Sequence, residues 1–383
     1  MTIVFLSDIP WDSLHQRPQH LATRLAGGAR ILWIEPATLG RGRYWKPVKL
    51  GEHLFRLTVP MFPLNARDHR VRRIASMLSR VPFLRAVLEG IRAWLLRRAL
   101  TQIAQGDQNP AFLVQNFQIG RLTDAVPAGR VVFDYIDDAF GFTPFPPHVV
   151  AQWHWMLHRA DTLTATSPML GGRMRKACGR DVLIIPNGVE FERFRAGEKA
   201  PRPDDLPSGG PLIGYVGSVY PWLDYSLLEY AADSLPDAHF VIVGHEHPDV
   251  QSRLSRLRDR PNVRILGVRP YAAVPAYLAA FDAAVIPFLK NTLTEGVNPV
   301  KLYEYSAAGV TSVATDFSPD NHAFEKFIFI AGTPGQFVAH LGAAIRRRHD
   351  PEAVAALRTF AQANDWNDRA AEFARLLSTS IHG

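Results

Sequence analysis

The chain has 383 residues, of which 47% are hydrophobic, and carries a formal net charge of +7. This length suffices for two domains, and the single cysteine, Cys178, excludes an internal disulfide framework. The basic charge admits nucleic acid, an anionic membrane or a phosphorylated substrate as partner. No apolar run reaches the roughly 18 residues of a membrane span. The first residues lack the basic region of a signal peptide, so we expect a cytoplasmic protein.

The N-terminal part is predicted to be a parallel α/β domain. Residues 2–7 form an apolar strand, followed by a loop, a helix near 19–26 and a strand at 29–34. The first turn lacks GxGxxG, which disfavours an NAD-dependent oxidoreductase. Ligands of such sheets bind beyond the carboxyl ends of the strands. The loop therefore offers candidate ligands for an acceptor sugar or a phosphate, although a capping Arg17 and a packed His20 fit equally well: Asp8, Trp11, Arg17, Gln19 and His20.

Residues 65–100 are unusually basic, with nine arginines, Arg67 among them, against two acidic residues. Apolar residues recur there at helical spacing, which predicts two amphipathic helices broken at Pro82. A basic amphipathic helix with Trp and Leu is typical of a membrane-surface element, whereas an ordinary helix with a solvated basic face is the alternative. The expected membrane-binding residues are Arg85, Arg92, Trp94, Arg97 and Arg98.

Further strands are expected at 111–116 and 130–135. The second ends in FDYIDDAFGF, which places Asp137 and Asp138 where site residues collect. These paired acids are the best candidates for a catalytic base, because each raises the pKa of the other. The alternative is that Asp138 caps a short turn and Asp137 forms a salt bridge. His154 and His158 have no third ligand at a suitable spacing, so we expect no metal site.

Residues 196–210, rich in Pro, Gly and charge, form the best linker in the chain. Strands and helices alternate after it, which predicts a second doubly wound α/β domain at 211–364. The first domain would cover 1–195 and be completed by a C-terminal helix at about 365–383.

The stretch from residue 291 to 315 is predicted to be a loop, a short helix from Val300, a left-handed cap at Gly309 and a strand. Pro299 suits the first helical turn. The positive end of the helix dipole and Lys301 favour an anion at the helix start. Glu304 follows one turn later on roughly the same face. These residue types suit a diphosphate at the helix start and a sugar hydroxyl at the carboxylate.

NPVKLYEYSAAGVTSVAT resembles the donor-sugar motif of GT-B glycosyltransferases. IGYVGSV, FVIVGH, the segment from NVRILG to VIPF, and PNGV occur in that family's order. The resemblance covers most of the chain and implies an α/β GT-B fold, with two Rossmann-like doubly wound domains facing a cleft. The N-terminal WDSLHQRPQHLATRLA resembles a subset that acts on bacterial polysaccharides and lipid-linked sugars. The two Glu of the motif are separated by eight residues rather than seven, so the family's first Glu position falls on Gly296.

The resemblance implies a role for each matching residue. Glu304 would bind the ribose, Val300 and Lys301 the diphosphate, and Val268 to Tyr271 the base. The implied donor-binding residues are Gly217, Ser218, Arg269, Tyr271, Glu295, Asn298, Pro299, Val300, Lys301 and Glu304. A catalytic base at Asp137 or Asp138 would resemble the base of the inverting glucuronosyltransferases. If the donor were a uronic acid, Arg269, Lys290 and Lys301 could pair with its carboxylate.

We therefore expect a glycosyltransferase that moves a sugar, from UDP by preference, to a lipid-linked or polysaccharide acceptor at the inner face of a bacterial membrane. No Asp-x-Asp signature occurs in the donor half, so we expect no metal or other cofactor. Inversion is slightly favoured, and retention stays open. The alternatives are a nucleotide-sugar 2-epimerase of the same fold and a non-catalytic nucleotide-binding protein. We expect no nucleic-acid partner, because no such motif is present.

Overall fold

A computed structural model describes residues 1–37, 45–64, 66, 68–142 and 145–378, which divide into two compact units. The first unit comprises residues 1–186 and 367–383, and the second comprises residues 187–366. The boundary follows Pro186 and does not lie in the segment predicted as a linker. That segment is packed within the second unit, since Leu206 is buried in its core and Gly197 lies directly against Pro275.

The first unit is an eight-stranded sheet in the order β3-β4-β2-β1-β5-β6-β7-β8, parallel except for the β3–β4 pair. Its strands are β1 (Thr2–Leu6), β2 (Arg30–Pro36), β3 (Val48–Lys49), β4 (Leu54–Val59), β5 (Ala111–Val114), β6 (Val131–Tyr135), β7 (Thr162–Ala165) and β8 (Leu183–Ile184). β1, β5 and β6 are buried along their whole length, as expected for a sheet covered on both faces.

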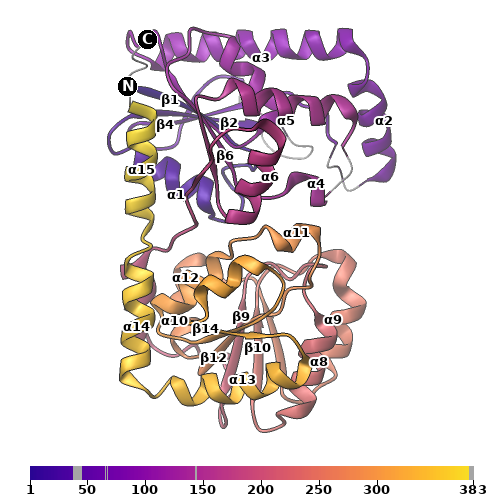
Figure 1. Cartoon of the computed structure of the whole chain (residues 1–383), viewed down its shortest axis with the longest axis vertical. Coiled ribbons are helices and arrows are strands. Elements are labelled where there is room, and N and C mark those ends of the chain that lie inside the picture. Colours follow the sequence, from indigo (N-terminus) through magenta and orange to yellow (C-terminus); the bar gives the residue numbers. More distant parts are fainter. Residues whose placement is uncertain (38–44, 65, 67, 143–144, 379–383) are drawn as a thin grey trace. The chain divides into compact units, whose positions relative to one another are not determined.

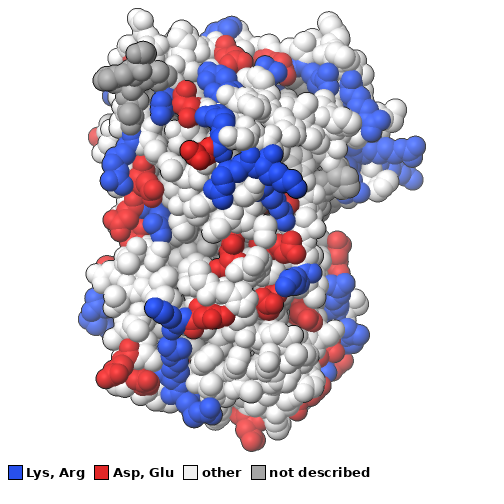
Figure 2. All heavy atoms as spheres, in the orientation of Figure 1, with Lys and Arg blue, Asp and Glu red and all other residues white. Residues whose placement is uncertain are grey.

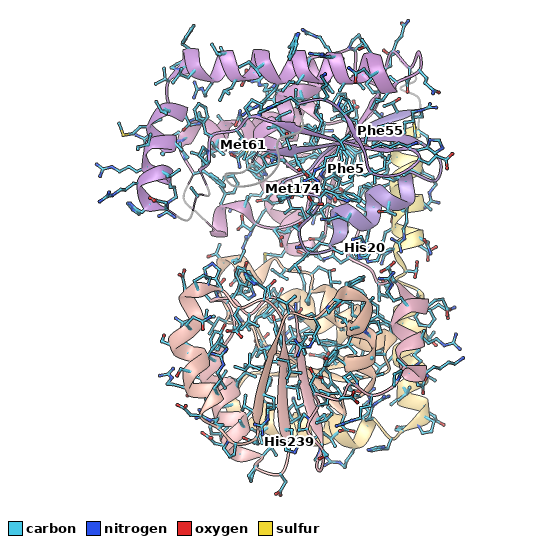
Figure 3. The ribbon with its side chains drawn as sticks, turned by 180° about the vertical axis from the view of Figure 1, so that it is seen from behind. Phe5, His20, Phe55, Met61, Met174 and His239 are labelled. Atoms are coloured by element: carbon cyan, nitrogen blue, oxygen red, sulfur yellow. The ribbon has the colours of Figure 1, made fainter. Side chains whose placement is uncertain are left out.

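The helices of the first unit cover this sheet (Figure 1). They are α1 (Arg17–Leu25), α2 (His69–Ser79), α3 (Pro82–Ile103), η1 (Phe117–Asp124), α4 (Ala139–Phe142), α5 (Pro147–Arg159), α6 (Pro168–Cys178) and, from the end of the chain, α15 (Trp366–Ser378). α15 docks on α1, because Arg24 Nε donates to Asn367 Oδ1 at 2.9 Å and the Arg17 guanidinium lies 5.4 Å from the centre of the Phe373 ring. Phe5 and Met174 lie within this unit (Figure 3) and are fully buried.

The second unit is an all-parallel six-stranded sheet in the order β11-β10-β9-β12-β13-β14. Its strands are β9 (Leu212–Val216), β10 (His239–Val243), β11 (Val263–Gly267), β12 (Ala283–Ile286), β13 (Ser312–Thr315) and β14 (Ile328–Ala331). Its longer helices are α7 (Phe191–Ala196), α8 (Tyr225–Ser234), α9 (Gln251–Arg258), α10 (Val274–Ala279), α12 (Val300–Ala307), α13 (Pro334–Arg347) and α14 (Pro351–Gln362). Short turns complete it: η2 (Gly197–Lys199), η3 (Pro248–Val250), η4 (Tyr271–Ala273), α11 (Thr292–Glu295) and η5 (Pro319–Phe324).

Helices lie on both faces of this sheet, since α8 packs with α9 and α13 while α12 packs with α7 and α14 (Figure 1). α12 has the predicted form, with Pro299 before it and Gly309 after it at φ 73°. The stretch before it is not wholly a loop. It contains α11, because the Asn291 side chain accepts from the backbone N–H groups of Leu293 and Thr294.

Among the described residues, no helix is long and apolar enough to cross a membrane.

Candidate active site

The second sheet reverses its strand order between β9 and β12, and Gly217 lies in the loop at this point. Gly217 has a φ of 145°, which residues with a side chain rarely adopt. A Cβ atom at Gly217 would collide with the end of the Lys301 side chain. Gly244, after β10, has a φ of 154°, and a Cβ there would collide with the Gly217 carbonyl. The two glycines therefore let the backbone of the loop lie close to the Lys301 ammonium. Such a combination of exposed backbone and positive charge suits a phosphate.

Lys301 stands in the first turn of α12, against two aromatic rings. Its Nζ lies 5.2 Å from the centre of the Tyr215 ring and 5.9 Å from that of Phe288. The surrounding protein desolvates the ammonium and lowers the pKa of Lys301, while the negative charge of Glu304 opposes this effect. The helix dipole adds positive potential at the same end. Lys301 is therefore a partly buried cation suited to an anionic ligand.

Glu304 has an acidic neighbour as well as Lys301. Desolvation raises the pKa of Glu304 to about 7, Lys301 opposes the shift, and the carboxylate of Glu190 adds to it. Tyr271 donates its hydroxyl to Glu190 Oε2 at 3.0 Å, and the Arg193 guanidinium lies 5.0 Å from the centre of the Tyr271 ring. Glu304 and Tyr271 therefore share Glu190 as a neighbour, and desolvation, followed by the charge of Glu304, raises the pKa of Tyr271. Sequence reasoning missed Glu190 and Arg193, although Glu190 directly follows the PNGV motif.

Other predicted donor ligands have their polar groups engaged by the fold. Arg269 pairs with Asp205 at 2.6 Å, and its remaining nitrogens donate to the Tyr277 hydroxyl and to backbone carbonyls. Buried Asn298 accepts from the Asn187 N–H at 2.8 Å and bonds the Tyr303 hydroxyl. Both residues therefore hold chain segments in place.

Two of the other predicted donor residues each accept a hydrogen bond at the backbone carbonyl. The Ser218 carbonyl accepts from Tyr215, and that of Glu295 accepts from Ser318. Lys290 lies 3.4 Å from Asp316, so its charge is already paired at the surface.

In the first unit, Arg17 is a structural residue. Only 3% of it is exposed, and it forms a two-pronged ion pair with fully buried Asp134 at 2.9 and 3.0 Å. Gln115 and Thr164 also donate to Asp134, each at 2.8 Å. Arg17 further donates to the Pro186 carbonyl at 2.9 Å. The guanidinium is therefore buried and engaged, and the expectation that Arg17 binds an acceptor directly is wrong.

Three further candidate residues, one in the loop and two on α1, also serve the fold. Gln19 accepts from the Gln16 N–H at the start of α1, and its amide donates to Ser13. Trp11 packs edge-on against Trp33. His20 lies on α1 (Figure 3), where it is 1% exposed, so it cannot reach a ligand from its buried position.

Asp8 and Asp137 remain as candidate site carboxylates, at the carboxyl ends of β1 and β6. Both side chains reach the surface, yet dense protein around them desolvates them. Desolvation, followed by the charges of Asp8 and Asp138, raises the pKa of Asp137 to about 7, and Arg17 opposes the shift. Desolvation raises the pKa of Asp8 to about 6, with a further contribution from Asp134. A carboxylate with a pKa near 7 suits a general base.

Asp138 has a different environment, although it is adjacent in sequence. It is 5% exposed, forms an ion pair with Arg173, and accepts from the Tyr135 hydroxyl at 3.2 Å. Its side chain also accepts from the Phe140 N–H at 3.2 Å, at the start of α4. Asp138 is therefore the cap of a short helix, whereas Asp137 remains exposed and carries a raised pKa.

α2 and α3 break at Pro82 as predicted, and several large apolar side chains on them face solvent. Met77 is 62% exposed, Phe83 72% and Trp94 54%. Figure 2 shows Lys and Arg gathered over α2, at the right-hand edge of that view. The prediction for Arg92 is wrong, because it is 6% exposed and donates to the Pro60 carbonyl at 2.7 Å, and burial lowers its pKa to about 10.

Arg97 and Arg98 are exposed, and Arg85 is half-buried. The Arg98 guanidinium lies 5.4 Å from the Trp94 ring centre. Arg67 lies outside the described residues. Within the described part of the chain, no group of three or more His, Cys, Asp or Glu side chains could hold a metal ion.

Residues 210–347 match the family model described as "Glycosyl transferases group 1". The second unit carries a group 1 glycosyltransferase domain. This match contains Gly217, Lys301 and Glu304, and it confirms the resemblance inferred from the donor motif.

A curated protein also resembles the chain in sequence. A Bacillus subtilis (strain 168) protein named for a teichuronic acid biosynthesis glycosyltransferase, TuaH, is 29% identical over 219 residues. The match covers 55% of each protein, so the chain spans about half the length of the curated relative that it matches.

Solved structures of several glycosyltransferases resemble the chain over nearly its whole length. One described as trehalose-6-phosphate from E. coli, bound with UDP-2-fluoro glucose, has a TM-score of 0.72 at 12% identity and covers 99% of both chains. Anabaena HepE, in complex with UDP and glucose, has a TM-score of 0.66 at 16% identity and covers 98% of this chain and 99% of that one. WaaG, involved in lipopolysaccharide biosynthesis, has a TM-score of 0.61 at 15% identity and covers 99% and 100%. These likenesses confirm the GT-B fold.

Proposed function

We propose that the protein transfers a sugar from a nucleoside-diphosphate sugar, with UDP the favoured nucleotide, to a lipid-linked or polysaccharide acceptor of the bacterial cell surface. The observation that carries this proposal is the combination of Lys301 and Glu304 on one helix beside Gly217, within a group 1 glycosyltransferase domain. Lys301 would neutralise the leaving diphosphate, and Glu304 would bind the ribose. The teichuronic acid name of the curated relative and the UDP complexes of structural neighbours support this choice.

The transfer would proceed by inversion, with Asp137 as the general base. Its pKa of about 7 lets the carboxylate accept the acceptor hydroxyl proton while the hydroxyl oxygen attacks the anomeric carbon. The nucleoside diphosphate then leaves with the electron pair of the broken bond, stabilised by Lys301 and the helix dipole. Since a protein cation serves the diphosphate, the reaction would need no metal.

The acceptor would be reached at the inner face of the membrane, through α2 and α3. Exposed Met77, Phe83 and Trp94 stand beside several arginines, as on helices that lie in an anionic lipid surface.

A transfer assay tests this function. The protein is incubated with UDP-sugars and GDP-sugars labelled in the sugar, in the presence and absence of a bacterial lipid extract and with EDTA present. We expect label in the lipid or polysaccharide fraction, with stoichiometric release of nucleoside diphosphate that depends on the extract. Release of free sugar without any acceptor would instead identify an epimerase, and nucleotide binding without transfer would identify a binding protein.

A further inference from the structure

A cavity lies in the first unit between α3, η1 and α5, where η1 packs with both of the longer helices. Its volume is about 730 Å³, which is within the range of small-molecule sites in proteins. The residues that line it all belong to the first unit and include neither Asp8 nor Asp137. We call it the α3 cavity. Its titratable lining residues are Arg85, Glu89, Arg92, Arg97, Arg121, Asp124 and His148.

Arg92 is the most deeply buried cation of the α3 cavity. Only 6% of it is exposed, and burial lowers its pKa to about 10 while the charge of Glu89 opposes the shift. Its Nε donates to the Pro60 carbonyl at 2.7 Å, whereas its two terminal nitrogens have no hydrogen-bond partner among the residues that the structure describes. A buried charge with so few partners is costly, and an anion in the cavity would offset that cost.

Arg85 and His148 extend the positive region around Arg92. Arg85 precedes Arg92 by seven residues, or about two helical turns, so both project from the same side of α3. Arg85 is half-buried and forms no ion pair with an acidic residue in the described part of the chain. Desolvation, followed by the charges of Arg85 and Arg80, lowers the pKa of His148. His148 stands in the first turn of the 13-residue helix α5, whose dipole adds positive potential at this end.

The two acidic lining residues leave the positive charge largely uncompensated. Asp124 is already engaged by Arg159 at 2.8 Å and lies 3.7 Å from Arg121. Glu89 acts on Arg92 only from a distance, because it forms no ion pair with any described residue. Four arginines oppose these two acids, which leaves a net charge of +2 in the lining. The cavity therefore favours an anion that carries more than one negative charge.

We propose that the α3 cavity is a second ligand site, which binds a phosphate ester with its phosphate group between Arg92 and Arg85. A phosphate monoester carries up to two negative charges and three acceptor oxygens, which suits two guanidinium groups at the start of a helix. The Gln152 amide, which also lines the cavity, can bond a hydroxyl group of the ester. The inference goes beyond the proposed function, because neither Lys301 nor Glu304 takes part in it.

Two sources carry this chemical group, a soluble sugar phosphate and the headgroup of a phospholipid, and they are distinguished by whether binding needs a vesicle. In one arm, the full-length protein is titrated calorimetrically with glucose 6-phosphate, glycerol 3-phosphate and, as a phosphate-free ligand, glucose. In the other, it is sedimented with phosphatidylcholine vesicles with and without phosphatidic acid. The variants are Arg85→Gln and Arg92→Lys. Lys176→Gln is the control, because it removes one positive charge at an exposed site on α6.

We expect a phosphate ester to bind the wild type and Lys176→Gln alike, and glucose to bind neither. Arg85→Gln should bind the ester about 10- to 100-fold more weakly, because a charge-assisted hydrogen bond is lost. Arg92→Lys keeps the charge but loses the planar guanidinium, so it should weaken binding about tenfold. A loss seen in the calorimetric arm identifies a soluble ester, and a loss confined to the vesicle arm identifies a lipid headgroup.

Two results would overturn this proposal. One is the absence of phosphate-dependent binding to the wild type in both arms. The other is an affinity that stays equal in the wild type and Arg85→Gln, because the phosphate would then be bound elsewhere, as at Lys301. Arg85→Gln decides the matter even if Arg92→Lys does not fold. Neither result bears on the proposed function, which sugar transfer and nucleotide binding test separately.

Discussion

Asp137 and Asp138 show how strongly local environment separates two identical residues. Asp138 is an ion-paired helix cap, whereas Asp137 is exposed and carries a raised pKa. A cap and a base need opposite properties, because the cap must remain ionised and fixed while the base must accept a proton near neutral pH.

Replacing Asp137 with Asn should lower turnover about 100-fold or more, because the acceptor hydroxyl would lose its base. Nucleotide-sugar affinity should stay unchanged, since this residue belongs to the first unit. Steady-state kinetics and donor titration of the same preparation measure both quantities. The same substitution at Asp138 should mainly lower the melting temperature. Full activity in Asp137→Asn would remove this residue from the mechanism.

The pH dependence should reveal the coupling between Asp8 and Asp137. A base with a pKa of about 7 makes kcat/KM rise with pH and level off above that value. Asp8→Asn removes a neighbouring negative charge, so the pKa of Asp137 should fall and the acid limb of the profile should move to lower pH. A limb that stays in place, or moves upward, would contradict the assignment.

The Arg17–Asp134 pair should matter for stability. Arg17→Ala leaves the buried Asp134 carboxylate without its main partner, which should cost about 3–5 kcal/mol of the free energy of unfolding. Urea denaturation measures this loss, and Arg73→Ala, at an exposed position on α2, is the control. A variant of normal stability with weakened acceptor binding would restore the ligand role that the sequence suggested.

At the scale of elements, α2 and α3 combine a basic composition with apolar side chains that the fold leaves uncovered. The helical spacing of these residues was visible in the sequence, and so was the break at Pro82. The sequence did not show which of these residues face inward, because that depends on where the sheet and Pro60 lie. Arg92 is therefore buried, whereas Phe83 is not.

Phe83→Ser should weaken sedimentation with vesicles that contain anionic phospholipid about tenfold, because a 72% exposed ring no longer enters the lipid. Replacing Arg97 and Arg98 with Ser should weaken sedimentation more at low salt than at high salt. Tyr230→Ser is the control in the second unit. Unchanged sedimentation in both sets would make α2 and α3 ordinary solvated helices.

At the scale of the whole molecule, the sequence predicted the two parallel α/β units and the position of the donor motif. Strand periodicity and the order of glycine-rich turns are local signals, and α12 with Gly309 has the predicted form. Long-range contacts could not be predicted. The pairs Arg17–Asp134 and Arg269–Asp205 join residues far apart in the chain. The sequence alone therefore could not distinguish an arginine that binds a ligand from one that forms an ion pair within the fold. The observed unit boundary after Pro186 differs from the predicted linker at 196–210 for the same reason, because a Pro- and Gly-rich stretch can still pack on its own domain.

If Lys301 and Glu304 form a nucleotide-sugar site, calorimetric titration with UDP, GDP and their sugars should detect it. We expect one of these nucleotides to bind the wild type. Glu304→Ala should weaken its binding at least tenfold, because a ribose hydroxyl loses its partner, and Glu192→Ala, at an exposed site on α7, should leave it unchanged. Absence of binding to the wild type, or equal affinity in all three proteins, would contradict this assignment.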